Sequence, residues 1–249
     1  MHLKLIACSI FQRELCALLA NTPHSVDVEF IEIAKHDLPN RLRELVQASI
    51  DKPGSRAYDA ILLAYGICGN TATGLIARDV PLVIPRAHDC ATILLGSRAA
   101  FLEHFGENPS HSFGCVGYFE RGFPGYNANT GETGDRPITD PNYQKFVDDY
   151  GEENARYIWE TLHPPVTDGR ALFITTPPTR GHPAEAAYRA AVEREGLAYT
   201  ELAGSMKMLD ALLNGPWDAF DFLVVPPGQK INAMYDQVQV MTAAPLQKA

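Results

Sequence analysis

Three cysteines stand where the sequence predicts that parallel strands end. Cys8, Cys68 and Cys90 each follow a different short apolar run, and His88 precedes Cys90 by two residues. Ligands of open α/β sheets bind beyond the carboxyl ends of the strands, so residues far apart in the sequence can converge there. Three thiolates with one imidazole suit a borderline or soft metal. The pattern therefore predicts a metal site with Cys8, Cys68, Cys90 and His88 as ligands.

The same residues admit a simpler interpretation. Free cysteine is buried like a small apolar residue, and none of the three cysteines belongs to a Cys-x-x-Cys knuckle. Three unreactive thiols in a core, beside a structural histidine, are the alternative. Cys16 lies within a helical pattern, and we expect it to be an inert core residue.

The elements that would position these residues are short apolar runs alternating with amphipathic helical patterns. We expect strands over residues 3–7, 26–31, 59–65, 80–85, 170–175, 198–202 and 221–225. Alternation of strands and helices is typical of βαβ units around a parallel sheet, and right-handed crossovers bring the carboxyl ends to one edge. The expected fold class is α/β, a Rossmann- or flavodoxin-like parallel sheet in two similar lobes, with a cleft at the strand carboxyl ends.

The two halves of the chain share this layout. Residues 1–112 are expected to form an N-terminal α/β lobe carrying the Cys/His site, and residues 143–249 a C-terminal α/β lobe. Residues 113–142 are rich in glycine and aromatic residues and lack regular periodicity. We therefore expect an irregular connection there.

Four polar residues near the predicted strand ends are candidates for binding a small-molecule ligand. Arg86 could hold a carboxylate or phosphate through its guanidinium, with Asp89 in the same loop, or the loops could instead form a salt bridge. Asn70 could bond a substrate or cap the following helix. Lys230 could help to bind an anion, or could belong to an ordinary exit from a strand.

The composition argues against several kinds of partner. The chain has 21 basic and 30 acidic residues and a net charge of −9, whereas nucleic-acid binding requires a basic face. No apolar stretch is long enough for a membrane helix, and the N-terminus lacks the pattern of a secretory signal. Five cysteines, an odd number in a chain of 249 residues, indicate thiols or metal ligands in a reducing compartment. We expect a cytoplasmic protein with no nucleic-acid or membrane partner.

Two motifs make the chain similar to a known family. They are Tyr65-Gly66-Ile67-Cys68-Gly69-Asn70, and Pro85-Arg86-Ala87-His88-Asp89-Cys90 followed by Leu94-Leu95-Gly96-Ser97. These segments, with Ile6-Ala7-Cys8 and Val224-Val225-Pro226-Pro227-Gly228, resemble the prokaryotic family catalogued as domain of unknown function 1638.

The resemblance implies that Cys8, Cys68, His88 and Cys90 belong to the family's characteristic motifs. It also implies an association with anaerobes and with corrinoid methyltransferases. The central segment departs from the family pattern at Gly114-Cys115, so Cys115 is not assigned as a ligand.

Three functions remain open. A metal protein could hold an iron–sulfur cluster with one iron open to substrate, or zinc with one exchangeable position, and serve electron transfer, lyase chemistry or corrinoid/methyltransferase maturation. The anaerobic association of the family favours the cluster. A metal-free, racemase- or isomerase-like enzyme could use two cysteines as acid and base, although the second half has none. A non-catalytic accessory module could dock a methyltransferase or corrinoid partner protein through residues 113–143.

Overall fold

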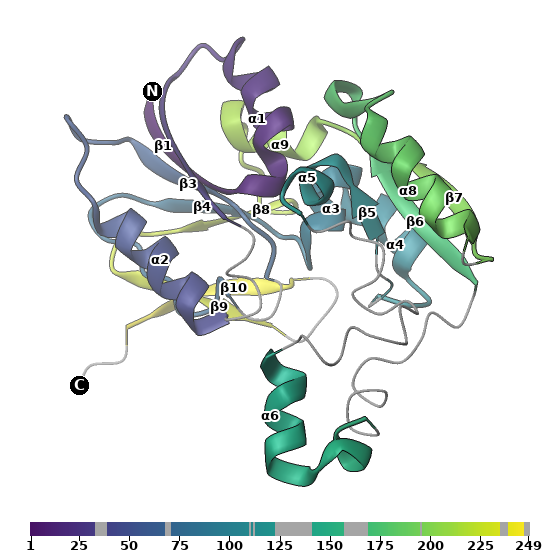
Figure 1. Ribbon diagram of the computed structural model, residues 1–249. Helices are drawn as coiled ribbons and strands as arrows, with labels where there is room; N and C mark the ends of the chain where they lie inside the picture. Colours follow the sequence, from purple (N-terminus) through teal and green to yellow (C-terminus); the bar gives the residue numbers. More distant parts are fainter. Residues whose placement is uncertain are drawn as a thin grey trace. The chain divides into compact units, whose positions relative to one another are not determined.

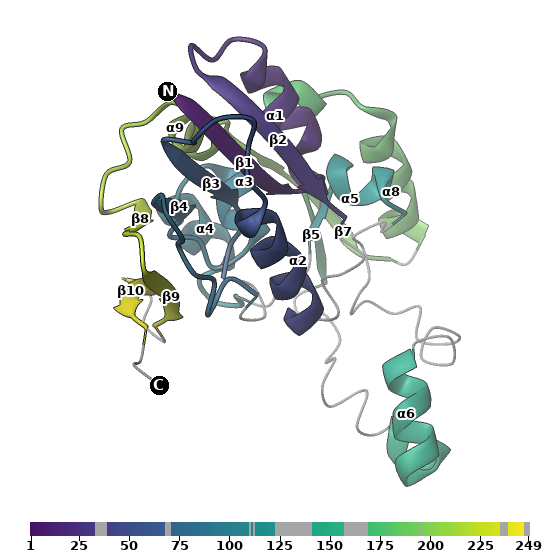
Figure 2. The ribbon, with the colours of Figure 1, turned by 90° about the vertical axis from the view of Figure 1, so that its left-hand side faces the viewer.

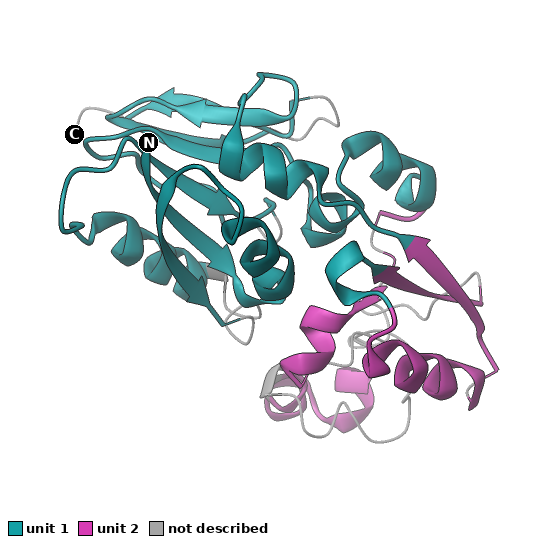
Figure 3. Cartoon of the chain, turned by 90° about the horizontal axis from the view of Figure 1, so that it is seen from above, with its two compact units in different colours: residues 1–107, 175–180, 203–249 teal, residues 108–174, 181–202 magenta. Residues whose placement is uncertain are grey.

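The computed structural model describes most of the chain. The described residues are 1–32, 39–67, 71–109, 111, 113–122, 141–156, 169–194, 196–234 and 239–246. The chain forms two compact units, which Figure 3 distinguishes by colour. Unit 1 comprises residues 1–107, 175–180 and 203–249, and unit 2 comprises residues 108–174 and 181–202.

Unit 1 is built on a five-stranded sheet with the strand order β2-β1-β3-β4-β8 (Figure 1). The strands are β1 (His2–Cys8), β2 (Ser25–Ile31), β3 (Ala60–Ala64), β4 (Leu82–Pro85) and β8 (Phe222–Val225). β1 pairs in parallel with β2 and β3, and β3 with β4, while β8 is antiparallel to β4. The neighbouring strands β1, β3 and β4 therefore end at the same edge of the sheet.

The central strands are buried along their whole length because both of their faces are covered. Every residue of β1, β3 and β4 is buried, as expected of strands inside a parallel sheet. The edge strand β2 instead retains exposed residues. The register sets Ala7 of β1 opposite Ala64 of β3, so Cys8 and Tyr65 are the next residues at the same level.

Helices cover both faces of this sheet. Those of unit 1 are η1 (Ser9–Phe11), α1 (Gln12–Leu19), α2 (Pro39–Asp51), α3 (Cys90–Leu95), α4 (Arg98–Phe105), η5 (Pro177–Thr179) and α9 (Lys207–Asn214). α1 and α9 contact each other on one face (Figure 1). α2 lies on the other face, as Figure 2 shows from the side of that helix. Right-handed crossovers explain this division, because α1 leads from β1 outward to β2 and α2 leads back to β3.

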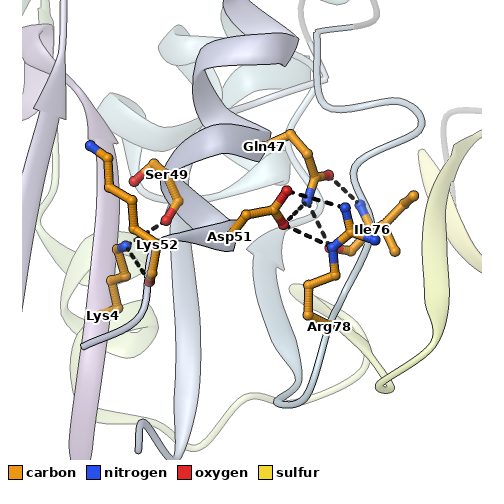
Figure 4. A network of polar contacts seen from close by, with 7 residues as sticks. All are labelled: Lys4, Gln47, Ser49, Asp51, Lys52, Ile76 and Arg78. Atoms are coloured by element: carbon orange, nitrogen blue, oxygen red, sulfur yellow. Dashed lines mark hydrogen bonds and ion pairs between the residues drawn. The ribbon is translucent and has the colours of Figure 1, made fainter. Parts of the chain in front are cut away.

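A buried lysine joins β1 to the end of α2 (Figure 4). Nζ of Lys4 donates to the carbonyl oxygens of Ser49 and Lys52 in the last turn of the helix and just beyond it. Carbonyls at a helix C-terminus lack intrahelical partners and favour a cation. Burial lowers the pKa of Lys4, and the nearby Glu29 carboxylate opposes that effect. Lys4 therefore fixes α2 on the sheet through its charge as well as its hydrogen bonds.

A second set of contacts joins α2 to the segment between β3 and β4 (Figure 4). Oε1 of Gln47 accepts a 2.8 Å hydrogen bond from the Ile76 backbone, and its Nε2 donates to the Ile76 carbonyl at 3.3 Å. Arg78 donates to both oxygens of Asp51, at 2.8 and 3.1 Å. The path of the chain from β3 to β4 is thereby held by the helix that precedes β3.

The same segment pairs with a C-terminal hairpin made of β9 (Gln229–Ala233) and β10 (Met241–Pro245). The backbone of Gly74 donates to the Ile231 carbonyl at 2.8 Å, and Ile231 donates to the Leu75 carbonyl at 2.9 Å. Residues 74–77 thus line one side of β9. The C-terminal part of the chain consequently supports the connection that leaves β3.

Arg86 joins β4 to these C-terminal segments. Its Nε donates to the carbonyl oxygens of Ala219 and Phe222, at 3.0 and 3.2 Å. Its Nη1 donates to the carbonyls of Gln239, at 2.6 Å, and Met241. One guanidinium therefore connects the end of β4 with both β8 and β10.

Unit 2 contains a three-stranded sheet in the order β5-β6-β7. Its elements are β5 (Phe113–Cys115), β6 (Arg170–Thr175), β7 (Ala198–Ala203), α5 (Val116–Glu120), α6 (Pro141–Tyr150) and α8 (Pro183–Arg194). Tyr188 of α8 donates to the Leu172 carbonyl at 2.9 Å and packs beside Phe173 in the core of the unit. A Cβ on Gly114 would lie 2.6 Å from the Tyr188 ring, so only glycine fits at this position of β5.

The structure confirms the α/β class with parallel strands, but the compact units differ from the expected segments 1–112, 113–142 and 143–249. Residues 203–249 belong to unit 1 because β8 pairs with β4. The irregular connection expected from residue 113 is wrong for its first part, which forms β5 and α5; a three-residue strand is too short to show periodicity. Residues 123–140 lie outside the described residues.

Among the helices that the structure describes, none has the length and apolarity needed to cross a bilayer.

We predict that Arg86→Gln lowers the free energy of unfolding by about 2–3 kcal/mol, because several carbonyls lose a charged donor. Arg78→Gln is the matched control, because its exposed ion pair with Asp51 contributes about 1 kcal/mol or less. Urea unfolding of the two variants and the parent chain measures the difference. Equal losses for the two substitutions would contradict the structural role of Arg86.

Candidate functional site

The candidate site lies at the edge of unit 1 where β1, β3 and β4 end. Cys8 is the last residue of β1, and Cys90 is the first residue of α3, which follows β4. Both are buried, with exposed fractions of 5% and 6%. Cys68, which comes after β3, lies outside the described residues. Because β1, β3 and β4 are neighbours in the sheet, the three segments that carry these cysteines all follow neighbouring strands.

The loops that follow β3 and β4 touch through their backbones. The backbone of Ile67 donates to the Ala87 carbonyl at 2.9 Å. A Cβ on Gly66 would lie 2.7–2.9 Å from the backbone atoms of Asp89, closer than real Cβ contacts come. Glycine at position 66 therefore permits the close approach of the two sequence motifs. The residues on either side of this contact lead directly to Cys68 and Cys90.

Tyr65 connects the two described cysteines of this edge. Burial raises the pKa of Tyr65 well above its ordinary value, and negative charge on Cys8 or Cys90 raises it further. Both cysteines therefore contribute to the electrostatic surroundings of Tyr65. The register of β1 and β3 places Tyr65 at the level of Cys8.

Asp89 acts as the N-cap of α3. Its Oδ1 accepts hydrogen bonds from the backbone N–H and the hydroxyl of Thr92, at 3.0 and 3.2 Å. A cap of this kind satisfies donors that the first turn leaves unpaired. The capping role sets the backbone at Cys90, and the predicted substrate-binding role of Asp89 stays a prediction.

His88 packs against α4. Its ring stacks on Phe101 with a centroid distance of 5.9 Å and an interplanar angle of 26°. Desolvation lowers the pKa of His88, and the nearby Arg98 lowers it further, so the imidazole is neutral at pH 7. Within the described part of the chain, no three His, Cys, Asp or Glu side chains are close enough to hold a metal ion.

The other predicted substrate-binding residues are placed as follows. Arg86 directs its guanidinium at carbonyls of the β8 and β10 segments, which favours a structural role over an anion clamp. Lys230 lies in β9, where it pairs with Ala244 and forms a bridge with Ile76. Asn70 lies outside the described residues, so its predicted role stays a prediction.

The remaining two cysteines lie in other elements, α1 and β5. The expectation that Cys16 is a core residue is wrong, since it is exposed on α1; the apolar stripe of that helix passes beside it, through the buried Leu15. Cys115 is buried in β5 of unit 2.

Sequence reasoning missed the hydroxyl groups near the end of β3. The hydroxyl oxygens of Tyr65, Thr71 and Thr73 are buried and form no hydrogen bond within the described residues. A tyrosine after an apolar strand suggests core packing, and threonines in a loop suggest a turn. Their proximity to the cysteine motifs in the sequence is the one signal that could have identified them.

These observations define an α/β protein that gathers buried thiols at the carboxyl ends of neighbouring parallel strands. The chain belongs to the family described as protein of unknown function (DUF1638), whose model matches residues 30–213. The match confirms the resemblance and includes Cys68, His88 and Cys90, while Cys8 and Lys230 lie outside the matched residues. No curated protein and no solved structure matches the chain.

We predict that Gly66→Ala destabilises unit 1 by about 1–3 kcal/mol, as expected when an added methyl forces backbones apart. The same substitution should increase the rate at which Cys8 and Cys90 react with a thiol reagent. Thermal melting and timed alkylation with mass spectrometry measure the two effects.

Gly228→Ala is a useful comparison for Gly66→Ala. Its Cβ would meet nothing within 4 Å, although its φ of +76° makes alanine strained there. That strain should leave the reactivity of Cys8 and Cys90 unchanged. Equal thiol reactivity in the two variants would contradict the importance of the contact between Gly66 and Asp89.

Proposed function

We propose that this protein binds a metal centre, an iron–sulfur cluster or zinc, through Cys8, Cys68 and Cys90 at the edge of the five-stranded sheet. The observation that carries the proposal is the strand order, in which the three segments leave neighbouring parallel strands. The contact between Gly66 and Asp89 supports it, because it holds together the loops that lead to two of the thiols.

The chemistry of the donors fits such a centre. Thiolates are the ligands of iron–sulfur clusters and of many zinc sites. Cys8 and Cys90 are buried and both influence the same phenol, in surroundings where a bound cation would compensate for the negative charge of two thiolates. Three protein sulfurs would leave one position on zinc, or one iron of a cluster, open to a small-molecule ligand.

His88 is assigned a place beside the centre. Stacking on Phe101 orients its ring, and the lowered pKa keeps the imidazole in its neutral form. A neutral imidazole can either bind a metal or hydrogen-bond a ligand. The stacking favours the second role, with ligation as the fourth donor as the alternative.

The proposal also includes the type of sheet, the location of the protein and the reaction that the metal centre serves. The sheet would be of Rossmann or flavodoxin type, with a cleft at the strand carboxyl ends, in a cytoplasmic protein. The centre would serve electron transfer, lyase chemistry or corrinoid/methyltransferase maturation, with a corrinoid or methyltransferase protein as the partner in the last case. The association with anaerobes that the sequence resemblance implies would favour an iron–sulfur cluster over zinc.

One observation favours a second function: negative charge on Cys8 and on Cys90 raises the pKa of the same residue, Tyr65. Two thiols around one small site could act as acid and base in a metal-free racemase or isomerase. Exchange of the α-protons of amino acids for deuterium by chelator-treated protein would favour this enzyme over the metal protein.

We predict that protein purified without oxygen contains one metal centre per chain, which Cys8→Ala, Cys68→Ala and Cys90→Ala each abolish. Cys16→Ala is the matched control, because Cys16 is exposed on α1. Loss of a ligand should lower metal affinity by more than the roughly 10–100-fold typical of losing an outer partner.

Elemental analysis and the visible spectrum measure this outcome. Brown protein that contains iron and sulfide supports the cluster, whereas colourless protein with stoichiometric zinc supports zinc and excludes the cluster. Metal-free wild-type protein, or equal metal content in Cys16→Ala and Cys68→Ala, would overturn the proposed function.

A further inference from the structure

The hydroxyl of Tyr65 is a buried polar group with no hydrogen-bond partner among the residues that the structure describes. The residue has an exposed fraction of 6%, and the phenolic oxygen forms no hydrogen bond within the described residues, including any to the sulfurs of Cys8 and Cys90. Other tyrosines differ, since Tyr58 donates to Asp27 at 2.7 Å and Tyr188 donates to Leu172 at 2.9 Å. Tyr65 therefore needs an explanation that the other two do not.

Two more hydroxyls close in the sequence share this property. The hydroxyl oxygens of Thr71 and Thr73 are also buried and without a hydrogen bond in the described part of the chain, and Thr71 has an exposed fraction of 4%. An unsatisfied buried hydroxyl destabilises a fold by about 1–3 kcal/mol. Native proteins contain few such groups, and they are concentrated where a ligand or water completes the hydrogen bonds.

We propose that Tyr65 contacts the ligand of the thiol site and donates a hydrogen bond to the carbonyl oxygen of an uncharged molecule. This inference deepens the proposed function and rests on it, because the ligand would occupy the metal position that sulfur leaves open. Tyr65 lies at the level of Cys8, one residue beyond the paired positions Ala7 and Ala64.

The charges around the phenol select an uncharged ligand. The groups that act on Tyr65 are Cys8, Cys90 and Glu29, all of them acidic. Tyr65 itself stays protonated at neutral pH and can donate. An anionic ligand would add negative charge to a divalent cation that three thiolates already overcompensate, whereas a carbonyl oxygen accepts the same hydrogen bond without adding charge.

The test compares acetamide with acetate, which have the same shape but different charge. The protein is loaded with Co²⁺, and the visible bands of thiolate-bound cobalt report that the site has formed. Bound cobalt accelerates the relaxation of methyl protons in a molecule beside it, so proton relaxation measures the binding of each probe. We expect wild-type protein to bind acetamide more tightly than acetate.

Tyr65→Phe should weaken acetamide binding about tenfold, the effect of one buried hydrogen bond. Tyr58→Phe is the matched control and should leave acetamide binding unchanged. The metal-free Tyr65→Phe protein should melt at the wild-type temperature or above it, because the substitution removes an unsatisfied hydroxyl. A melting temperature several degrees lower would assign Tyr65 a purely structural role and overturn the inference.

The other outcomes distinguish failure of the inference about Tyr65 from failure of the proposed metal-binding function. Absence of thiolate-to-cobalt bands in the wild type would overturn the metal site, and the inference with it. Normal bands with equal acetamide affinity in the wild type and Tyr65→Phe would overturn the inference alone and leave an ordered water as the partner of the hydroxyl. Tighter binding of acetate than of acetamide would overturn the uncharged ligand class.

Discussion

The site depends on a backbone contact that admits no side chain. Gly66 lies so close to Asp89 that an added Cβ would fall within 3 Å of three backbone atoms, and the Ile67 backbone donates to Ala87 one residue further on. Because parallel strands in a sheet are about 4.8 Å apart, the loops that leave them separate unless something holds them together. This contact keeps the segments after β3 and β4 adjacent beyond the end of their pairing.

Much of this arrangement could be predicted from the sequence. Buried strands of a parallel sheet are mostly apolar, so β1, β3 and β4 stand out as short runs, whereas the edge strand β2 is indicated by alternation. Their order along the chain with intervening helices indicates parallel pairing. The convergence of Cys8 and Cys90 on one edge follows from that topology alone. The capping role of Asp89 also has a local signal, an aspartate three residues before a threonine at a helix start.

The rest depends on contacts between distant residues, which no local pattern encodes. The run at 221–225 identifies a strand, but nothing in it says that β8 pairs antiparallel with β4 rather than extending a second lobe. The hydrogen bonds of Arg86 could not be predicted from the sequence, because their acceptors are backbone carbonyls more than a hundred residues away. Carbonyls have no residue type, so a bond of this kind leaves no trace in the sequence.

A site that contains buried thiols and an unsatisfied phenol lowers the stability of the fold around it, because each polar group leaves water without full compensation. The surrounding contacts offset that loss. Lys4 and Gln47 hold α2 to the sheet and to the segment after β3 (Figure 4), and Arg86 holds the end of β4. These bonds attach to strand ends and connecting segments rather than to the thiols themselves. The backbone at the edge can therefore stay in place while the polar groups of the site remain available to a ligand, which is how strain at functional positions persists in a marginally stable protein.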